Sequence, residues 1–182
     1  IDYENTRMIN MNSNRMLDEQ AAWLDNVLAS NPKTWSIVTF HHPIYSSSDR
    51  KQNKELRKKW KPILEKHGVD LVLQGHDHRY SRGRSTNIPY GNNIKDSVGT
   101  VYVVSVSGAK MYKTRPNRWD DFDDLILDAS AENTQLFQVI RINGRVLSFE
   151  AYTAVGDLFD AFDIVKGNPN IGLPNVLIER KD

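Results

Sequence analysis

Two short apolar runs separated by one helical segment constrain the fold of this chain most strongly. The runs WSIVTF (35–40) and VDLVLQ (69–74) are rich in apolar and β-branched residues, as strands buried on both faces are. Between them, residues 54–68 carry apolar side chains at helical spacing and end at Gly68, a typical helix stop. Strand, helix and strand form a βαβ unit, so we expect the two strands to be parallel neighbours in one sheet.

The rest of the chain divides into a further helical segment and a set of strands. Residues 15–30 have a helical pattern, and Pro62 either kinks the helix at 54–68 or lies in the first turn of a second one. In the second half, Asn143-Gly144 is typical of a tight hairpin turn. We therefore expect an α/β first half that runs into antiparallel strands. The expected strands lie at 99–108, 134–142, 145–154 and 156–166, with a polar stretch at 109–130.

Histidines follow both strands of the βαβ unit. His41 comes directly after the first strand, and His76 and His78 come just after the second. In open α/β sheets, ligands lie beyond the carboxyl ends of the parallel strands, and neighbouring strands are about 5 Å apart. Imidazole is a common ligand of zinc, iron and manganese-type sites. The spacing is therefore compatible with one metal site that His41, His76 and His78 share.

Other interpretations of the polar residues stay open at this point. A lone histidine is more often a satisfied surface or core residue than a metal ligand. His42 points away from its neighbour if the backbone is extended, so at most one of the pair faces the site. His67 is better explained as a favourable charge near a helix C-terminus.

The acidic run 120–124 has no calcium-loop spacing and is interpreted as a solvated loop. The order H-D-H, with no later histidine, does not fit a two-histidine, one-carboxylate iron site, and a G-x-S-x-G hydrolase elbow is missing.

Composition excludes several classes of protein. The 182 residues contain no cysteine, which rules out disulfides, thiolate zinc sites and thiol nucleophiles. The formal net charge of +1 leaves no basic excess for nucleic acid, and no run approaches the roughly 18 apolar residues of a membrane helix. We therefore expect one domain's length of chain with neither a nucleic-acid nor a membrane partner.

The histidines lie in the segments VTFHHPIY and GHDHRYSR, which contain the patterns H-x-P-x-Y and G-H-x-H-x-Y-x-R in this order. At these segments the sequence resembles the calcineurin-like metallophosphoesterases, and most closely their purple-acid-phosphatase-like branch, where both motifs occur in the same order. The flanking segments resemble the family as well: QAAWLDNVLASNPKTWSIVTF, GTVYVVSVSGAKMY and AYTAVGDLFDAFDIVK. Both motifs in order with matching flanks extend the resemblance over nearly the whole chain.

The resemblance implies a fold, a site and an activity. The family's fold is a four-layer α/β/β/α sandwich, of which this chain would form the C-terminal half, with βαβ followed by antiparallel strands. Two metal ions (iron, zinc or manganese) lie in the family's site and activate a water that attacks phosphorus. By position, His41 and His76 would bind one metal and His78 the other. The implied activity is that of a phosphatase or phosphodiesterase, with a phosphorylated small molecule or a phosphoprotein as substrate.

The family's earlier motifs are missing from this chain. D-x-H, G-D-x-x-Y and G-N-H-D/E do not occur before residue 41, so the family's bridging aspartate, asparagine ligand and proton-donating histidine have no counterpart. We therefore expect residues 1–182 to be a single partial domain without its N-terminal part. Such a fragment would bind one metal or none and would be inactive alone. The sequence assigns no catalytic or substrate-binding residue and no location, although relatives are often secreted or periplasmic.

The expected truncation has a structural consequence. Without the family's N-terminal strands, an apolar strand of the βαβ unit becomes a sheet edge with unpaired backbone groups. We expect either a homodimer through this exposed edge or the N-terminal segment IDYENTRMINM laid across it.

Overall fold

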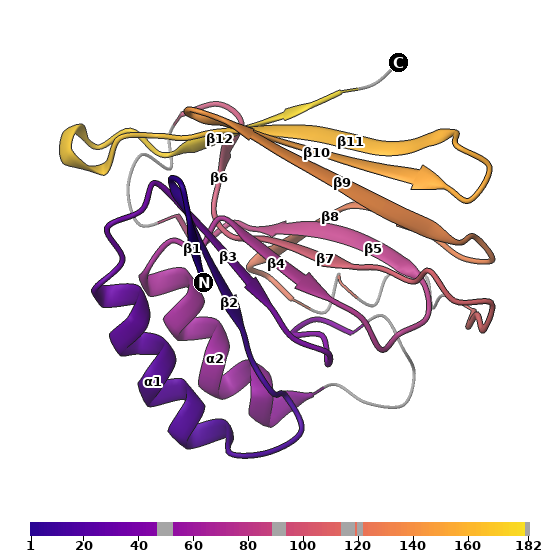
Figure 1. The fold of residues 1–182 in the computed structure, drawn as a ribbon, viewed down its shortest axis with the longest axis horizontal. Coiled ribbons are helices and arrows are strands. Elements are labelled where there is room, and N and C mark those ends of the chain that lie inside the picture. The colour runs from indigo at the N-terminus through magenta and orange to yellow at the C-terminus, as the bar shows by residue number, and fades with distance from the viewer. Residues whose placement is uncertain (47–52, 89–93, 114–118, 120–121, 181–182) are drawn as a thin grey trace.

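Helices and two sheets form three layers in the computed structural model, which describes all residues except 47–52, 89–93, 114–118, 120–121 and 181–182 (Figure 1). The helices α1 (Leu17–Ala29) and α2 (Lys54–Lys66) cover one face of a seven-stranded sheet, and a five-stranded sheet covers its other face. The described residues thus form an α/β/β arrangement, and they place no helical layer on the outer face of the five-stranded sheet.

The seven-stranded sheet contains the expected βαβ unit. Its strands lie in the order β1-β2-β3-β4-β7-β5-β8, and β3 and β4 are parallel neighbours, as predicted. The pairs β2–β3 and β4–β7 are parallel too, whereas β5 runs antiparallel to β7 and β8. The bounds are β1 Asp2–Tyr3, β2 Thr6–Asn10, β3 Trp35–Thr39, β4 Leu71–Gln74, β5 Tyr80–Ser85, β7 Val101–Val104 and β8 Leu125–Ala131.

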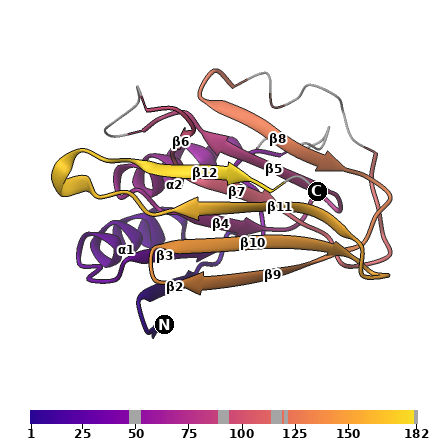
Figure 2. The ribbon, with the colours of Figure 1, turned by 90° about the horizontal axis from the view of Figure 1, so that it is seen from above.

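The five-stranded sheet is antiparallel, in the order β6-β12-β11-β10-β9. The predicted hairpin is confirmed, because β9 pairs with β10 around Gly144, which has a left-handed φ of 54°. Figure 2 looks down on this sheet where it lies over the seven-stranded one. Its bounds are β6 Ser97–Val98, β9 Leu136–Asn143, β10 Val146–Thr153, β11 Leu158–Val165 and β12 Asn175–Glu179, and a 3-10 turn, η2, spans Pro169–Ile171.

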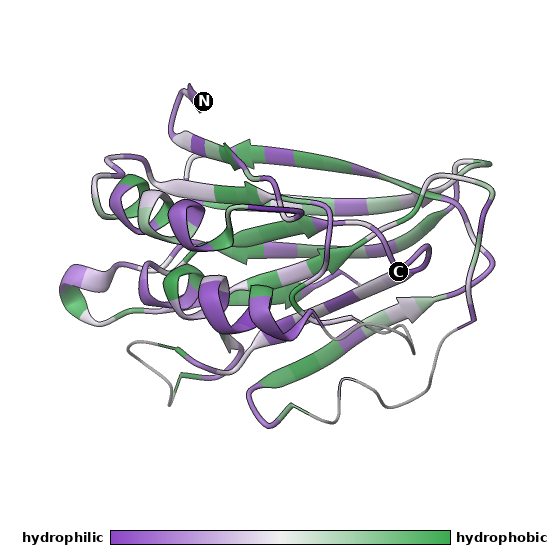
Figure 3. Ribbon diagram, turned by 90° about the horizontal axis from the view of Figure 1, so that it is seen from below, coloured by the Kyte–Doolittle hydropathy of each residue, from purple (hydrophilic) through white to green (hydrophobic). Residues whose placement is uncertain are grey.

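The alternation of side chains along each strand divides the core in two. In β3, Val38 packs among the apolar side chains of α1 and α2, whereas Trp35 and Ile37 pack toward the five-stranded sheet. Figure 3 views the helical side, where hydrophilic and hydrophobic residues alternate along the helices. Trp60 is fully buried, and its indole N–H donates to the Leu17 carbonyl at 2.9 Å, which ties α2 to the start of α1.

The structure excludes one alternative for Pro62 and contains a strand that was not predicted. Pro62 does not begin a second helix, because α2 runs through it from Lys54 to Lys66. The polar stretch at 109–130 contains most of β8, an edge strand that the sequence pattern did not predict and that exposes Ile126 and Leu127. The described residues contain no helix that is both long and apolar enough to cross a membrane.

The N-terminal segment takes one of the two places expected for it. β2 lies along β3 with the parallel register Met8 to Ile37, so β3 is not a sheet edge. β1 folds back on β2, and the N-terminal ammonium donates to the Met8 carbonyl at 2.8 Å. The apolar strands of the βαβ unit are therefore paired on both sides within this chain.

Candidate metal centre

The carboxyl ends of β3 and β4 bring His41 and His76 into contact. The parallel ladder continues past the strand ends, where the Phe40 N–H donates to the Leu73 carbonyl and the Gly75 N–H donates to the His41 carbonyl at 3.0 Å. The rings of His41 and His76 then lie with centroids 5.0 Å apart, and His41 Nε2 is 3.0 Å from His76 Nδ1. The predicted convergence of these two residues, 35 positions apart, is what the structure shows.

The turn after β4 holds two histidines in a strained backbone conformation. His76 has a φ of 71° and His78 a φ of 53°, values in the left-handed region that residues with a Cβ rarely adopt. Such residues cost on the order of 1–3 kcal/mol each and cluster at functional sites. Between them Asp77 is buried, and its carboxylate accepts hydrogen bonds from the Ser46 hydroxyl at 2.9 and 3.0 Å. The turn is thus anchored to the loop that follows His41.

His42 lies within the same group, contrary to the expectation that only one of the adjacent histidines faces the site. Its ring centroid is 4.4 Å from that of His76 and 4.9 Å from that of His41. The alternation on which the expectation rested applies to extended strands, but β3 ends at Thr39 and both histidines lie in a bend. One ligand nitrogen from each of the three residues lies within 4.8 Å of the others.

His78 is held separately from this group. Its Nδ1 lies 2.8 Å from the Lys110 carbonyl, and its ring packs 5.0 Å from that of Tyr112. A carbonyl can only accept a hydrogen bond, so Nδ1 carries the hydrogen and the neutral ring keeps its lone pair on Nε2. Histidine ligands of metals typically donate their second N–H in this way. Among the described residues, however, the close group comprises His41, His42 and His76, without His78 and without a carboxylate.

His67 and Tyr45 are structural in this fold. His67 follows α2 at its C-terminal end, where its Nε2 is 2.6 Å from Asp25 Oδ1. Lys66 and His67 bond to the Asp25 carboxylate and hold its pKa below its ordinary value. Tyr45, from the H-x-P-x-Y segment, is buried against Tyr102 and Phe122, and this burial raises the pKa of its hydroxyl.

In the acidic run 120–124, Asp124 pairs with Lys61 at 2.6 Å, while residues 120 and 121 lie outside the described part of the chain.

The spacing of the close group suits a metal ion. Two nitrogens that each lie about 2.1 Å from a zinc ion are about 3.0 Å apart at a right angle and about 3.4 Å apart at a tetrahedral angle. The separation of 3.0 Å between His41 Nε2 and His76 Nδ1 is at the short end of this range. Without a metal, the same separation is a hydrogen bond in which one ring donates to the other. Both rings can therefore ligate one ion with little movement.

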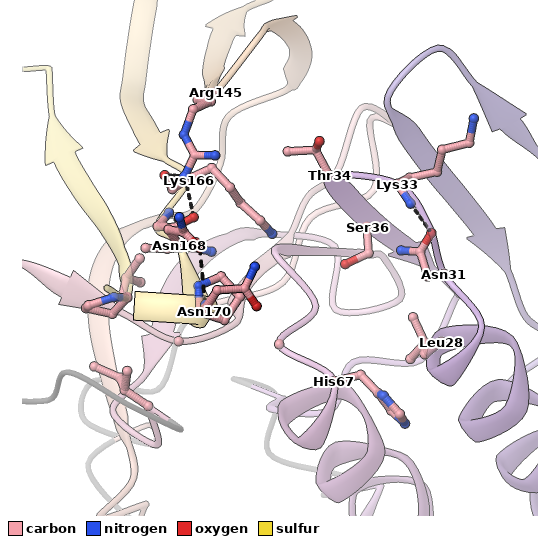
Figure 4. A pocket seen from close by; sticks show the side chains of 18 of the residues that line it. Leu28, Asn31, Lys33, Thr34, Ser36, His67, Arg145, Lys166, Asn168 and Asn170 are labelled. Carbon is pink, nitrogen blue, oxygen red and sulfur yellow. Dashed lines mark hydrogen bonds between the residues drawn. The ribbon is translucent and has the colours of Figure 1, made fainter. Parts of the chain in front are cut away.

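Two of the cavities that the described residues line lie at opposite ends of the parallel strands. A hollow of about 540 Å³ adjoins His42 and is otherwise lined by residues of the β2–α1 loop and the start of α2, among them Ser13, Asn14 and Lys54. A cavity of about 670 Å³ lies at the amino ends of the parallel strands, between the C-terminal ends of α1 and α2 and residues 166–175 (Figure 4). Its lining includes His67 but no residue of the close histidine group, so the larger cavity is not part of the metal centre.

Comparison with known proteins finds similarity to phosphoesterases over part of the chain. The family model of the calcineurin-like phosphoesterases matches residues 1–80. Purple acid phosphatase 18 of Arabidopsis thaliana is 31% identical over 115 residues, which cover 57% of this chain and 25% of that protein. Tartrate-resistant acid phosphatase type 5 of Oryctolagus cuniculus is 35% identical over 89 residues, which cover 49% of this chain and 24% of that protein.

A solved structure extends the likeness over most of the fold. The purple acid phosphatase from yellow lupin seeds superposes with a TM-score of 0.64 at 20% identity, and the match covers 91% of this chain. It covers 32% of the lupin chain. The predicted fold class is confirmed, and the chain spans about a quarter of the length of the curated relatives that it matches.

Proposed function

Since its first 80 residues match the calcineurin-like phosphoesterase family and part of its length is homologous to purple acid phosphatases, we propose that this chain belongs to a protein that hydrolyses phosphoesters with a dinuclear metal centre. These relatives support the metal-dependent phosphoesterase class. The dinuclear centre, and its distribution between this chain and further residues of a longer protein, are the proposal.

One observation carries the proposal more than any other. His41 Nε2 and His76 Nδ1 lie 3.0 Å apart beyond the carboxyl ends of adjacent parallel strands, where α/β folds bind their ligands. The two residues occupy the histidine positions of the H-x-P-x-Y and G-H-x-H motifs. Local sequence and tertiary geometry therefore point to the same pair of ligands.

Each residue has a proposed part in holding the metals. His41 and His76 bind one ion, and His78, with Nδ1 donating to the Lys110 carbonyl, offers Nε2 to the other. The ions supply Lewis-acid activation of water and charge for the phosphoryl oxygens. The strained turn at His76 and His78 fixes where the imidazoles point, and the buried Ser46–Asp77 contact keeps that turn against the loop of His41.

We propose a class of metal ions and a class of substrates, because the ligands do not select a single member of either. Imidazole suits zinc, iron and manganese, so the pair in the longer protein is drawn from these ions. The hollow beside His42 takes the organic part of a phosphorylated small molecule or of a phosphoprotein side chain.

Phosphatase assays on the longer protein test this proposal. With manganese, iron or zinc added, we expect hydrolysis of an aryl phosphate at ordinary enzymatic rates, on the order of 1 per second or more. His76→Ala should lower kcat by about 100-fold or more, while His67→Gln, outside the centre, should leave kcat within about twofold. Metal-dependent hydrolysis that survives His76→Ala unchanged would contradict the proposal.

A second candidate function applies to residues 1–182 alone, as a non-catalytic partial scaffold. It is favoured by the close group of described residues, which offers three imidazoles and no carboxylate to bridge two ions. Two-metal hydrolysis needs ions about 3.5–4 Å apart. We therefore expect negligible turnover from this polypeptide under the same assay conditions, and ordinary turnover would refute it.

A further inference from the structure

His42 is a metal ligand in its own right, and we infer that it forms a three-imidazole site with His41 and His76 that this chain holds without help from any other residue. The resemblance assigns His41, His76 and His78, and leaves His42 out. The structure groups the residues differently, because the close set of ligand nitrogens contains His42 instead of His78. This inference concerns metal binding by the 182-residue chain and does not require the phosphoesterase proposal.

The rings are arranged around a common space. The centroid of His76 lies 4.4 Å from that of His42 and 5.0 Å from that of His41. Because the facing nitrogens of His41 and His76 are 3.0 Å apart and all three ligand atoms lie within 4.8 Å, a shift of at most about 1.4 Å in His42 brings its nitrogen to the separation of about 3.4 Å found in a tetrahedral site. Side-chain rotation provides a shift of this size.

Ser13 fixes the ring of His42 through two contacts. Its hydroxyl oxygen accepts a hydrogen bond from the His42 backbone N–H at 2.9 Å and lies 2.9 Å from His42 Nδ1. Ser13 is buried just after β2, so the hydroxyl cannot easily move away. The Ser13 hydroxyl can donate to Nδ1 or accept from it, and zinc bound at Nε2 requires the tautomer in which Nδ1–H donates to Ser13. A second N–H bonded to an acceptor is the usual arrangement of a histidine ligand.

The donor set points to zinc or a similar borderline divalent ion. Three neutral nitrogens suit zinc, and hard oxygen-seeking ions such as magnesium and calcium are disfavoured. Three protein ligands are also the number found in catalytic zinc sites, where the fourth position is open. A hollow of about 540 Å³ adjoins His42, so solvent and small molecules can reach this side of the histidine group.

Zinc binding to the purified 182-residue chain tests the inference. Zinc is titrated at neutral pH against a chromophoric chelator, and circular dichroism checks that each variant is folded. His42→Gln should weaken zinc binding by about 100-fold or more, as should His41→Gln and His76→Gln. Ser13→Ala should weaken it by about 10-fold to 100-fold, the range for lost hydrogen-bonding partners of metal ligands. The control His67→Gln should stay within about threefold of the unaltered chain, and His78→Gln should weaken zinc binding less than His42→Gln does.

X-ray absorption of the zinc-loaded, unaltered chain provides a second measurement that does not depend on any variant folding. We expect three imidazoles per zinc ion. Two imidazoles, no zinc binding at all, or a loss with His78→Gln as large as that with His42→Gln would each overturn the inference. The phosphoesterase proposal fails separately, because it depends on the hydrolysis assay of the longer protein and its His76→Ala variant.

Discussion

Asp77 is the residue between the two histidines of the G-H-D-H segment, and its burial explains how that segment keeps its shape. The carboxylate is 1% exposed, and the Ser46 hydroxyl donates to it across 31 positions of sequence. A buried carboxylate without hydrogen-bond donors is strongly disfavoured. Ser46 therefore stabilises the conformation in which His76 and His78 flank Asp77 on a left-handed backbone.

Ser46→Ala tests this role of the buried hydroxyl. Because a donor to a buried charge is lost, the free energy of unfolding should fall by about 1.5–3 kcal/mol, measured by urea denaturation. Ser30→Ala is the matched control, since the Ser30 hydroxyl bonds the Asn26 carbonyl on an exposed helix end and should matter less than half as much. Equal losses in the two variants would contradict the assigned role.

The sequence predicted that His41 and His76 converge, but not the residues that orient the histidines. His41 and His76 follow recognisable apolar runs, so parallel-strand geometry is enough to bring them together. Ser13 and Ser46 reach their partners across 29 and 31 positions, and such contacts follow no local spacing. The partner of His78 is the Lys110 backbone carbonyl, which has no side-chain signature at all. His42 was misjudged because the bend after β3 breaks the alternation of an extended strand.

At the scale of elements, apolar periodicity was sufficient for α1, α2, β3, β4 and the β9–β10 hairpin. It did not predict β5, because Arg82 and Arg84 give this strand a polar sequence. Arg82 is nevertheless 1% exposed, and it pairs with Asp128 of β8, Asp160 of β11 and Glu179 of β12. A buried arginine that joins both sheets is stabilised by carboxylates on other strands. The hydropathy of a single strand gives no information about these partners, so the burial of Arg82 could not be predicted from it.

Gly83, in the middle of β5, allows the close approach of β8 and Trp119. A Cβ at this position would lie 2.3 Å from the Ile126 carbonyl oxygen and 2.4 Å from a Trp119 ring carbon. Gly83→Ala should therefore lower the free energy of unfolding by about 1–3 kcal/mol or more in thermal or urea denaturation. Gly108→Ala, where a Cβ meets nothing within 4 Å, should change it by less than about 0.5 kcal/mol. A neutral Gly83→Ala would show that β5 and β8 are not packed this closely.

Asp128 makes the junction of the sheets sensitive to pH. Burial raises its pKa from 3.8 to about 6, against the lowering effect of Arg84 and Arg82. Between about pH 4 and pH 6, Asp128 therefore keeps its proton in the folded state, whereas the same carboxyl loses it in the unfolded chain. This contribution to stability is full below about pH 4 and is lost as the pH rises through about 6.

Asp128→Asn removes that pH dependence. Between about pH 4 and pH 7, the free energy of unfolding of the unaltered chain should fall relative to the variant by up to about 3 kcal/mol, at about 1.4 kcal/mol for each unit of pKa shift. Urea denaturation at several pH values measures the difference. Asp157→Asn, on an exposed turn, is the control and should run parallel to the unaltered chain. Parallel curves for Asp128→Asn as well would mean that this carboxyl is not protonated in the folded protein.

At the scale of the whole molecule, the N-terminal hairpin decides which strands are edges. β2 covers β3, and β1 covers part of β2, so the edge on this side ends in a strand of two residues. The other edges are β8 in the larger sheet and β6 and β9 in the smaller. A homodimer through an exposed edge stays a proposal, and β9, with eight residues, offers the longest such edge among the described strands.

The two ends of the sandwich contain different features. Both histidine loops lie at the carboxyl ends of the parallel strands, whereas the cavity of Figure 4 lies at their amino ends. The helices and the five-stranded sheet pack on opposite faces of the larger sheet. The carboxyl ends of its parallel strands are therefore left to the loops. This division places the candidate metal centre on a rigid support while its ligands come from loops.

The central claim is that a metal ion binds where β3 and β4 end, and anomalous X-ray diffraction from zinc-loaded crystals of the 182-residue chain tests it most directly. The account predicts an anomalous zinc peak about 2.1 Å from both His41 Nε2 and His76 Nδ1. Crystals grown with saturating zinc that show no peak within about 4 Å of these two atoms would contradict it.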